Sequence, residues 1–98
     1  MPVVKFTEVA KDLNITEGRR YKLREVYINS EHVILMREDD YSHELLNEDK
    51  LPAGLDRRQR FTRISLQKGS AGQEIVVVGT PEMVEQKLFS INKNILRG

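Results

Sequence analysis

The strongest constraint on the fold comes from residues 24–39, where two short apolar runs flank a polar corner and end in acidic residues. The chain there reads REVYINSEHVILMRED. Apolar runs this short, rich in Val, Ile and Tyr, are typical of β-strands. The corner, Asn29 to His32, has side chains that bond nearby backbone groups and end a ladder. We therefore expect two strands joined as a hairpin in the middle of a sheet.

The same signals recur elsewhere along the chain. Period-two runs bounded by turn residues predict strands at about residues 3–9, 21–28, 33–38, 60–67 and 74–79. The last two are separated by KGSAGQ, a Gly/Ser turn, and so form a second hairpin. This stretch lacks the Lys-Ser/Thr ending of a phosphate loop, so its glycines are assigned to the turn.

The C-terminal segment carries the signals of a helix start. Thr80 is a good N-cap, Pro81 fits the first helical position and Glu82 favours the positive end of the helix dipole. An amphipathic helix is expected from about residue 81 to about 92. The predicted fold is α+β, a small antiparallel β-meander of about five strands with a C-terminal amphipathic helix, in one domain over residues 1–98. The expected core comprises Phe6, Val26, Ile28, Val33, Leu35, Ile64, Leu66, Ile75, Val77, Val84 and Leu88.

Several classes of protein are disfavoured by the composition. The chain has no cysteine, so it has neither disulfides nor thiolate metal sites. No apolar run approaches the ~20 residues that a membrane helix needs, and the first residues do not have the pattern of a secretory signal. We therefore expect a cytoplasmic protein that does not bind membranes.

Charge is segregated along the chain although the net charge is only +1. Residues 31–56 hold eight acidic residues against two basic ones, whereas residues 57–98 hold eight basic against three acidic. Opposite charges on different segments favour head-to-tail self-association, giving a homo-oligomer, or a polyanionic partner on the basic side. Solvated loops would give the same pattern.

The acidic segment from about residue 39 to 56 is expected to be an insertion or flap. YSHELLNE has room for about two helical turns before Pro52 and Gly54 end them. Aromatic and aliphatic side chains on such a flap can anchor a protein partner. The expected partner-binding residues are Tyr41, Leu45, Leu46 and Leu51.

Two arginine-rich clusters support nucleic-acid binding as an alternative. Each contains an aromatic residue, which is the composition of a groove that neutralises phosphates and stacks bases. The clusters consist of Arg19, Arg20, Tyr21, Lys22 and Arg24, and of Arg57, Arg58, Arg60 and Arg63 around Phe61. Within residues 7–24 a helix-turn-helix is a competing interpretation of the strand and loop pattern.

Catalytic and metal-binding patterns are not recognisable. His32 and His43 lack the helical spacing of zinc sites, and the adjacency of Ser42 and His43 does not direct both side chains to one reacting atom. We predict that the protein is not an enzyme and holds no metal or cofactor.

The order of elements from Tyr27 to Leu88 resembles a known family. VYINSEHV, a charged strand and then FTRISLQKGSAGQEIVVVGTPEMVEQKL are similar to the small flagellar and swarming motility proteins, apart from the acidic insertion. The resemblance implies no catalytic residue and no cofactor. Together these patterns predict a non-enzymatic regulatory or adaptor protein of a bacterium or its phage, which acts by binding a protein partner.

Overall fold

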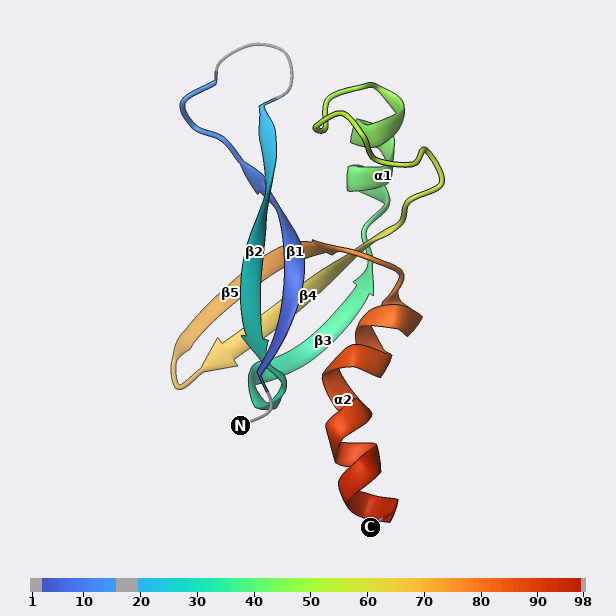
Figure 1. The fold of residues 1–98 in the computed structure, drawn as a ribbon. Helices are drawn as coiled ribbons and strands as arrows, with labels where there is room; N and C mark the ends of the chain where they lie inside the picture. Colours follow the sequence, from blue (N-terminus) through green and yellow to red (C-terminus); the bar gives the residue numbers. More distant parts are fainter. Residues whose placement is uncertain (1–2, 16–19, 98) are drawn as a thin grey trace.

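The chain folds into a five-stranded antiparallel sheet with two α-helices (Figure 1). The computed structural model describes residues 3–15 and 20–97, and the backbone alone for residues 91–97. The elements are β1 (Val3–Lys11), β2 (Tyr21–Asn29), the 3-10 turn η1 (Ser30–His32), β3 (Val33–Glu38), α1 (Asp40–Asn47), β4 (Phe61–Lys68), β5 (Ala71–Val78) and α2 (Pro81–Arg97). The predicted α+β class, with five strands and a C-terminal helix, is confirmed.

The strand order is β2-β1-β5-β4-β3, so β2 and β3 lie at opposite edges of the sheet. The hairpin predicted between them, in the middle of the sheet, is therefore wrong. A tight two-residue hairpin needs a residue with positive φ, usually glycine, and the corner at Asn29 has none. Instead the side chain of Asn29 accepts a hydrogen bond from the Glu31 backbone N–H and caps η1, which leads the chain to the far edge.

The shortness of this link requires the sheet to curl. Four residue steps separate Asn29 from Val33 and span at most roughly 14 Å of extended chain. Five strands side by side in a flat sheet would place the two edges about 19 Å apart. Consistent with a curled sheet, β1 pairs with β2 along its whole length but meets β5 at a single register pair, Glu8 and Val77.

The second predicted hairpin, between β4 and β5, is confirmed. Lys68 pairs with Ala71 across a two-residue turn. Gly69 has φ 61° at the first turn position, which matches a type II′ turn.

Two hydrophobic clusters lie on the two faces of this hairpin. Side chains alternate between faces along a strand, so Ile64 and Val77 join the first cluster while Phe61 and Val78 join or contact the second. Helix α2 covers the first cluster and α1 covers the second. The buried members are Phe6, Ile28, Ile64, Ile75, Val77, Val84 and Leu88 in the first cluster, and Val9, Leu45, Leu46, Leu51 and Phe61 in the second.

Most of the predicted core is observed, with one error on β3. Seven of the eleven expected residues form the first cluster, and Val26, Val33 and Leu66 pack against it. Leu35 is 42% exposed. A β-bulge between Val33 and Leu35 places Leu35 opposite Ser65, on the other face of the sheet, and Met36 takes the core side.

Helix α2 begins where the sequence predicts and ends five residues later than expected. Thr80 Oγ1 accepts a hydrogen bond from the Met83 backbone N–H at 3.2 Å, which confirms Thr80 as the N-cap. Val84 and Leu88, one helical turn apart, are both buried against the sheet. The last turns of α2 extend beyond the sheet in Figure 1.

Candidate partner-binding surface

Helix α1 is fixed at its start by Asp39, which is buried at the end of β3. The Asp39 carboxylate accepts hydrogen bonds from the backbone N–H and the hydroxyl of Ser42, and so caps the helix. Tyr41, in the first turn of the helix, has 57% of its surface exposed. Tyr41 was predicted to bind a partner, and its exposure leaves it accessible to one.

Tyr41 meets Tyr21 of β2, which is far from it in sequence. Burial and a side-chain hydrogen bond with Tyr41 raise the pKa of the Tyr21 phenol above its usual value. A raised pKa is the behaviour of a phenol that keeps its proton as a donor. Tyr41 of α1 therefore lies next to Tyr21 at the start of β2.

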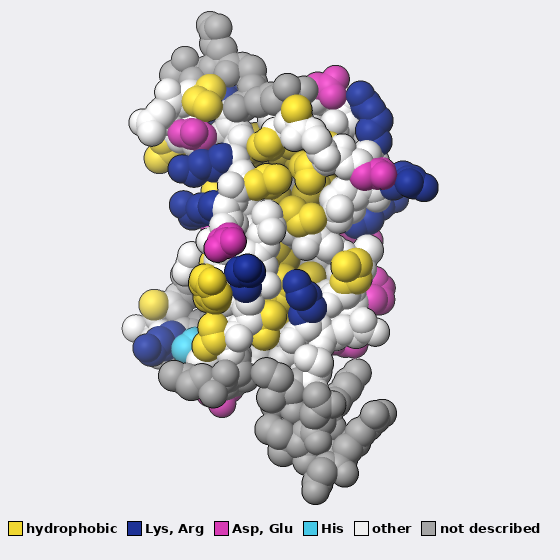
Figure 2. All heavy atoms as spheres, in the orientation of Figure 1, with side chains coloured by type: hydrophobic (Ala, Val, Ile, Leu, Met, Phe, Trp, Pro, Cys, Tyr) yellow, Lys and Arg dark blue, Asp and Glu magenta, His cyan; other side chains and the backbone are white. Residues whose placement is uncertain are grey.

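An apolar surface lies between these two elements. Figure 2 shows hydrophobic side chains gathered in the hollow between the upper end of the β1–β2 hairpin and α1. The floor of this hollow is formed by partly buried residues that pack against the second cluster. Tyr41 lies at the edge of the hollow. We call this surface the flap face and define it by Tyr21, Leu23, Tyr41, Leu55, Val76 and Val78.

The three leucines expected as partner anchors are not at this surface. Leu45, Leu46 and Leu51 are 5%, 6% and 2% exposed and form the second cluster with Phe61. The expectation that they are available to a partner is corrected by this burial. The acidic segment is therefore part of the core as well as a flap, because its apolar residues cover one face of β4 and β5.

Two positively charged residues border the flap face on the hairpin side. Lys11 lies directly opposite Tyr21 in the β1–β2 register, and Arg20 precedes Tyr21 in the chain. Within the described part of the chain neither Lys11 nor Arg20 has an ion-pair partner. Their charges remain available to a partner.

The second arginine cluster is neutralised within the protein. Each of its four arginines contacts a carboxylate: Arg57 with Asp49, Arg58 with Asp56, Arg60 with Glu38, and Arg63 with Asp39 and Glu74. The hydrogen bond and charge of Asp56 raise the pKa of Arg58, and the same contact lowers the pKa of Asp56. A phosphate would have to displace these carboxylates.

The described part of the first arginine cluster belongs to strand β2 or directly precedes it, and none of it is helical. Residues 3–11 and 21–29 are β-strands, so the helix-turn-helix interpretation of residues 7–24 is wrong. Arg19 lies outside the described residues. Arg24 contacts the Glu8 carboxylate at 2.9 Å, and Lys22 lies on the same face as Arg24.

The two clusters do not form a continuous groove. Strands β1 and β5 separate β2 from β4. Ile28 and Ile64 both point to the face of the sheet that carries the first hydrophobic cluster. Side chains alternate along a strand, so Arg24 lies on this face, whereas Arg63, next to Ile64 in sequence, lies on the opposite face. Within the described residues the two arginine clusters therefore do not form one phosphate-binding surface.

Neither histidine belongs to a cluster of metal-binding side chains. His43 Nδ1 lies 3.2 Å from the Gln59 carbonyl oxygen, and His32 lies in η1 at the other end of β3. Among the described residues no group of three or more His, Cys, Asp or Glu side chains is placed to hold a metal ion.

No family model matches the chain, and neither a curated protein nor a solved structure matches it. The resemblance to the flagellar and swarming motility proteins therefore stays a prediction. Of the helices that the structure describes, neither is long and apolar enough to cross a membrane.

Sequence reasoning missed five of the six residues of the flap face as members of a partner-binding surface. Tyr21 was assigned to a basic cluster, and Leu23, Leu55, Val76 and Val78 were given no binding role. Val76 and Val78 belong to an apolar run with both faces buried or half-buried, so their pattern does not distinguish core from surface. For Tyr21 and Leu23 the available signal is their shared place on the odd-numbered face of β2.

Proposed function

We propose that the protein is a non-enzymatic regulatory or adaptor protein that binds a protein partner through the flap face. The observation that carries the proposal is the tyrosine pair at this surface. Tyr41 is more than half exposed, contacts Tyr21, and stands beside a half-buried apolar floor.

This arrangement has the properties of a protein-binding hot spot. Tyrosine is enriched in the energetic centres of interfaces because it buries a large apolar ring at low entropic cost and keeps a polar hydroxyl. Contact with Tyr21 restricts Tyr41 before a partner arrives, which reduces the entropy lost on binding. The second cluster beneath packs against the Tyr21 ring and so holds the partner of Tyr41 in place.

Charge further defines the partner. Lys11 and Arg20 are exposed beside Tyr21, and within the described residues neither forms an ion pair with a carboxylate. A partner with an apolar centre and acidic residues at its rim would complement this side, and rim charges mainly raise the association rate. We therefore propose a protein segment of that composition. The family resemblance, which implies no catalytic residue, supports a binding role, and we propose that the protein acts in the cytoplasm.

The test needs point substitutions rather than removal of the flap. Deleting residues 41–55 would remove Leu45, Leu46 and Leu51 from the core and unfold the protein. A displayed peptide library selected against the wild-type protein provides a probe, and the selected peptide is then titrated against variants. Tyr41→Ala should weaken binding by roughly 30-fold, the effect of a hot-spot residue.

Tyr27→Ala is the matched control. Tyr27 is also on β2 and 65% exposed, but six residues, or about 20 Å, from Tyr21 along the strand. Its substitution should leave the affinity unchanged. The proposal fails if no peptide is enriched, or if both substitutions reduce affinity equally.

A further inference from the structure

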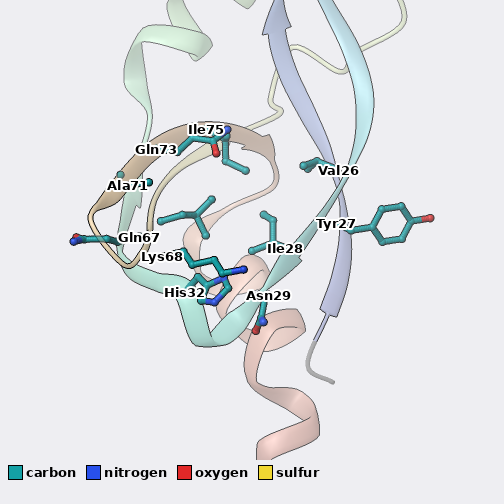
Figure 3. A pocket seen from close by; sticks show the side chains of 12 residues that line it. Val26, Tyr27, Ile28, Asn29, His32, Gln67, Lys68, Ala71, Gln73 and Ile75 are labelled. Carbon is teal, nitrogen blue, oxygen red and sulfur yellow. The ribbon is translucent and has the colours of Figure 1, made fainter.

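A pocket of about 380 Å³ lies away from the flap face, where the end of β2 approaches the tip of the β4–β5 hairpin (Figure 3). Its walls come from the last residues of β2, from η1 and from the strand ends next to the Gly69–Ser70 turn. The volume is at the small end of the range for ligand pockets, about 300–1,000 Å³. A compact ligand would fit and a long acyl chain would not.

The centre of the pocket is apolar. Val26 and Ile28 line it from β2, and Leu66 and Ile75 line it from the hairpin. All four belong to the first hydrophobic cluster or pack against it, so these walls are held by the core. Such walls favour an apolar ligand body because contact removes apolar surface from water.

One end of the pocket is polar and positive. Figure 3 shows the side chains of Lys68 and His32 close together at this end, with Asn29 below them and its amide group directed away from Lys68, whereas Tyr27 and Gln67 point away from the pocket. Among the described residues that line the pocket none is acidic.

These polar groups have capacity for a ligand. Lys68 has no ion-pair partner in the described part of the chain. Asn29 uses its side-chain oxygen to accept from Glu31, which leaves its amide N–H groups to donate. A lysine ammonium beside apolar walls is complementary to an anion with an apolar body.

From this geometry we propose that the pocket binds a small organic carboxylate with a short apolar chain. The carboxylate contacts Lys68, His32 adds a ring N–H donor, and the chain enters between Ile28 and Leu66. This site is separate from the flap face, since Ile28 and Leu66 belong to the first cluster and the flap face lies on the second. The proposal does not depend on the function proposed above.

Hexanoate is a suitable probe and hexanamide, which has the same shape and no charge, is its matched control. Each is titrated into the ¹⁵N-labelled protein at neutral pH while amide chemical shifts are followed. Hexanoate should shift the amides of Ile28, Lys68 and Gly72, and should bind about tenfold more tightly than hexanamide, the ratio expected from a charge-assisted hydrogen bond.

Lys68→Gln should remove the preference for the acid. Lys68 is exposed at the end of β4, so the folded spectrum should persist. Lys22→Gln, on an exposed residue at the other end of β2, should keep the preference. The proposal is wrong if hexanoate leaves the pocket amides unshifted, if hexanamide binds equally well, or if Lys68→Gln retains the tenfold difference.

Discussion

Asp39 and Arg63 form a half-buried ion pair that fixes α1 to the sheet. Arg63 donates from Nε and Nη2 to Asp39 Oδ1 at 3.2 and 3.1 Å, while Asp39 Oδ2 accepts from Ser42. The Asp39 side chain is 7% exposed and that of Arg63 is 37% exposed. One carboxylate thus serves both as helix cap and as partner of a strand arginine.

Arg63→Gln should destabilise the protein. The substitution leaves the buried Asp39 carboxylate without its counter-charge, and removing one partner of a buried pair is strongly unfavourable. Because Arg63 is partly exposed we expect a loss of about 1–3 kcal/mol in the free energy of unfolding, measured in urea. Arg58→Gln should leave the urea unfolding curve unchanged, because both Arg58 and its partner Asp56 are exposed. Equal curves for wild type and Arg63→Gln would contradict this role.

The phenol of Tyr21 should titrate above its ordinary pKa of 10.0 because of burial and its hydrogen bond with Tyr41. Ultraviolet titration should therefore show a phenol midpoint above pH 10.0 that disappears in Tyr21→Phe and moves downwards in Tyr41→Phe. Since the folded pKa is raised, the stabilisation is fully present below pH 10.0 and is lost as pH rises through the folded pKa. A Tyr21 midpoint that Tyr41→Phe leaves unchanged would refute the contact.

Charged substitutions should separate core positions from surface ones. Val77→Asp, Leu88→Asp and Leu51→Asp each lose about 1.5–3 kcal/mol of apolar burial and also bury a carboxylate, which together exceed the margin of a small domain. All three should lose the dispersed amide spectrum of a folded protein. Leu35→Asp should keep it, because Leu35 is 42% exposed. A folded Leu51→Asp variant would show that the second cluster is dispensable.

Nucleic-acid binding should be weak or undetectable in mobility-shift assays with single-stranded DNA, RNA and duplex DNA at about 50 mM salt. The reason is that the arginines from 57 to 63 are each paired with a carboxylate. A strong shift that disappears on Arg57→Glu and Arg60→Glu would show that phosphates displace Asp49 and Glu38. Arg63 is omitted from this test because its reversal would disturb α1 through Asp39.

Local sequence signals predicted local structure well. The cap at Thr80 and the turn at Gly69 depend on neighbouring residues, and both were found where expected. The position of β3 at the edge far from β2 depends on pairing with β4, which is distant in sequence. Likewise the bulge that turns Leu35 outward is a property of the β3–β4 register.

The candidate site was only partly predictable for the same reason. Tyr41 is exposed, as its predicted binding role required, but its contact with Tyr21 depends on the tertiary fold. Leu45 and Leu46 were read as surface anchors because a short helix in an acidic segment resembles a solvated loop. Their burial follows from a second apolar face on β4 and β5, which the near-continuous valine run permits without specifying.

The single pairing of Glu8 with Val77 divides the sheet into two backbone units. Hydrogen bonds run throughout β1–β2 and throughout β3–β4–β5, but the described ladder joins these units at this one register pair. Cooperative opening should therefore begin along this junction, with each unit keeping its internal bonds. In native-state hydrogen exchange the β1–β2 amides should exchange as a group, while those shared by β4 and β5 stay protected until global unfolding.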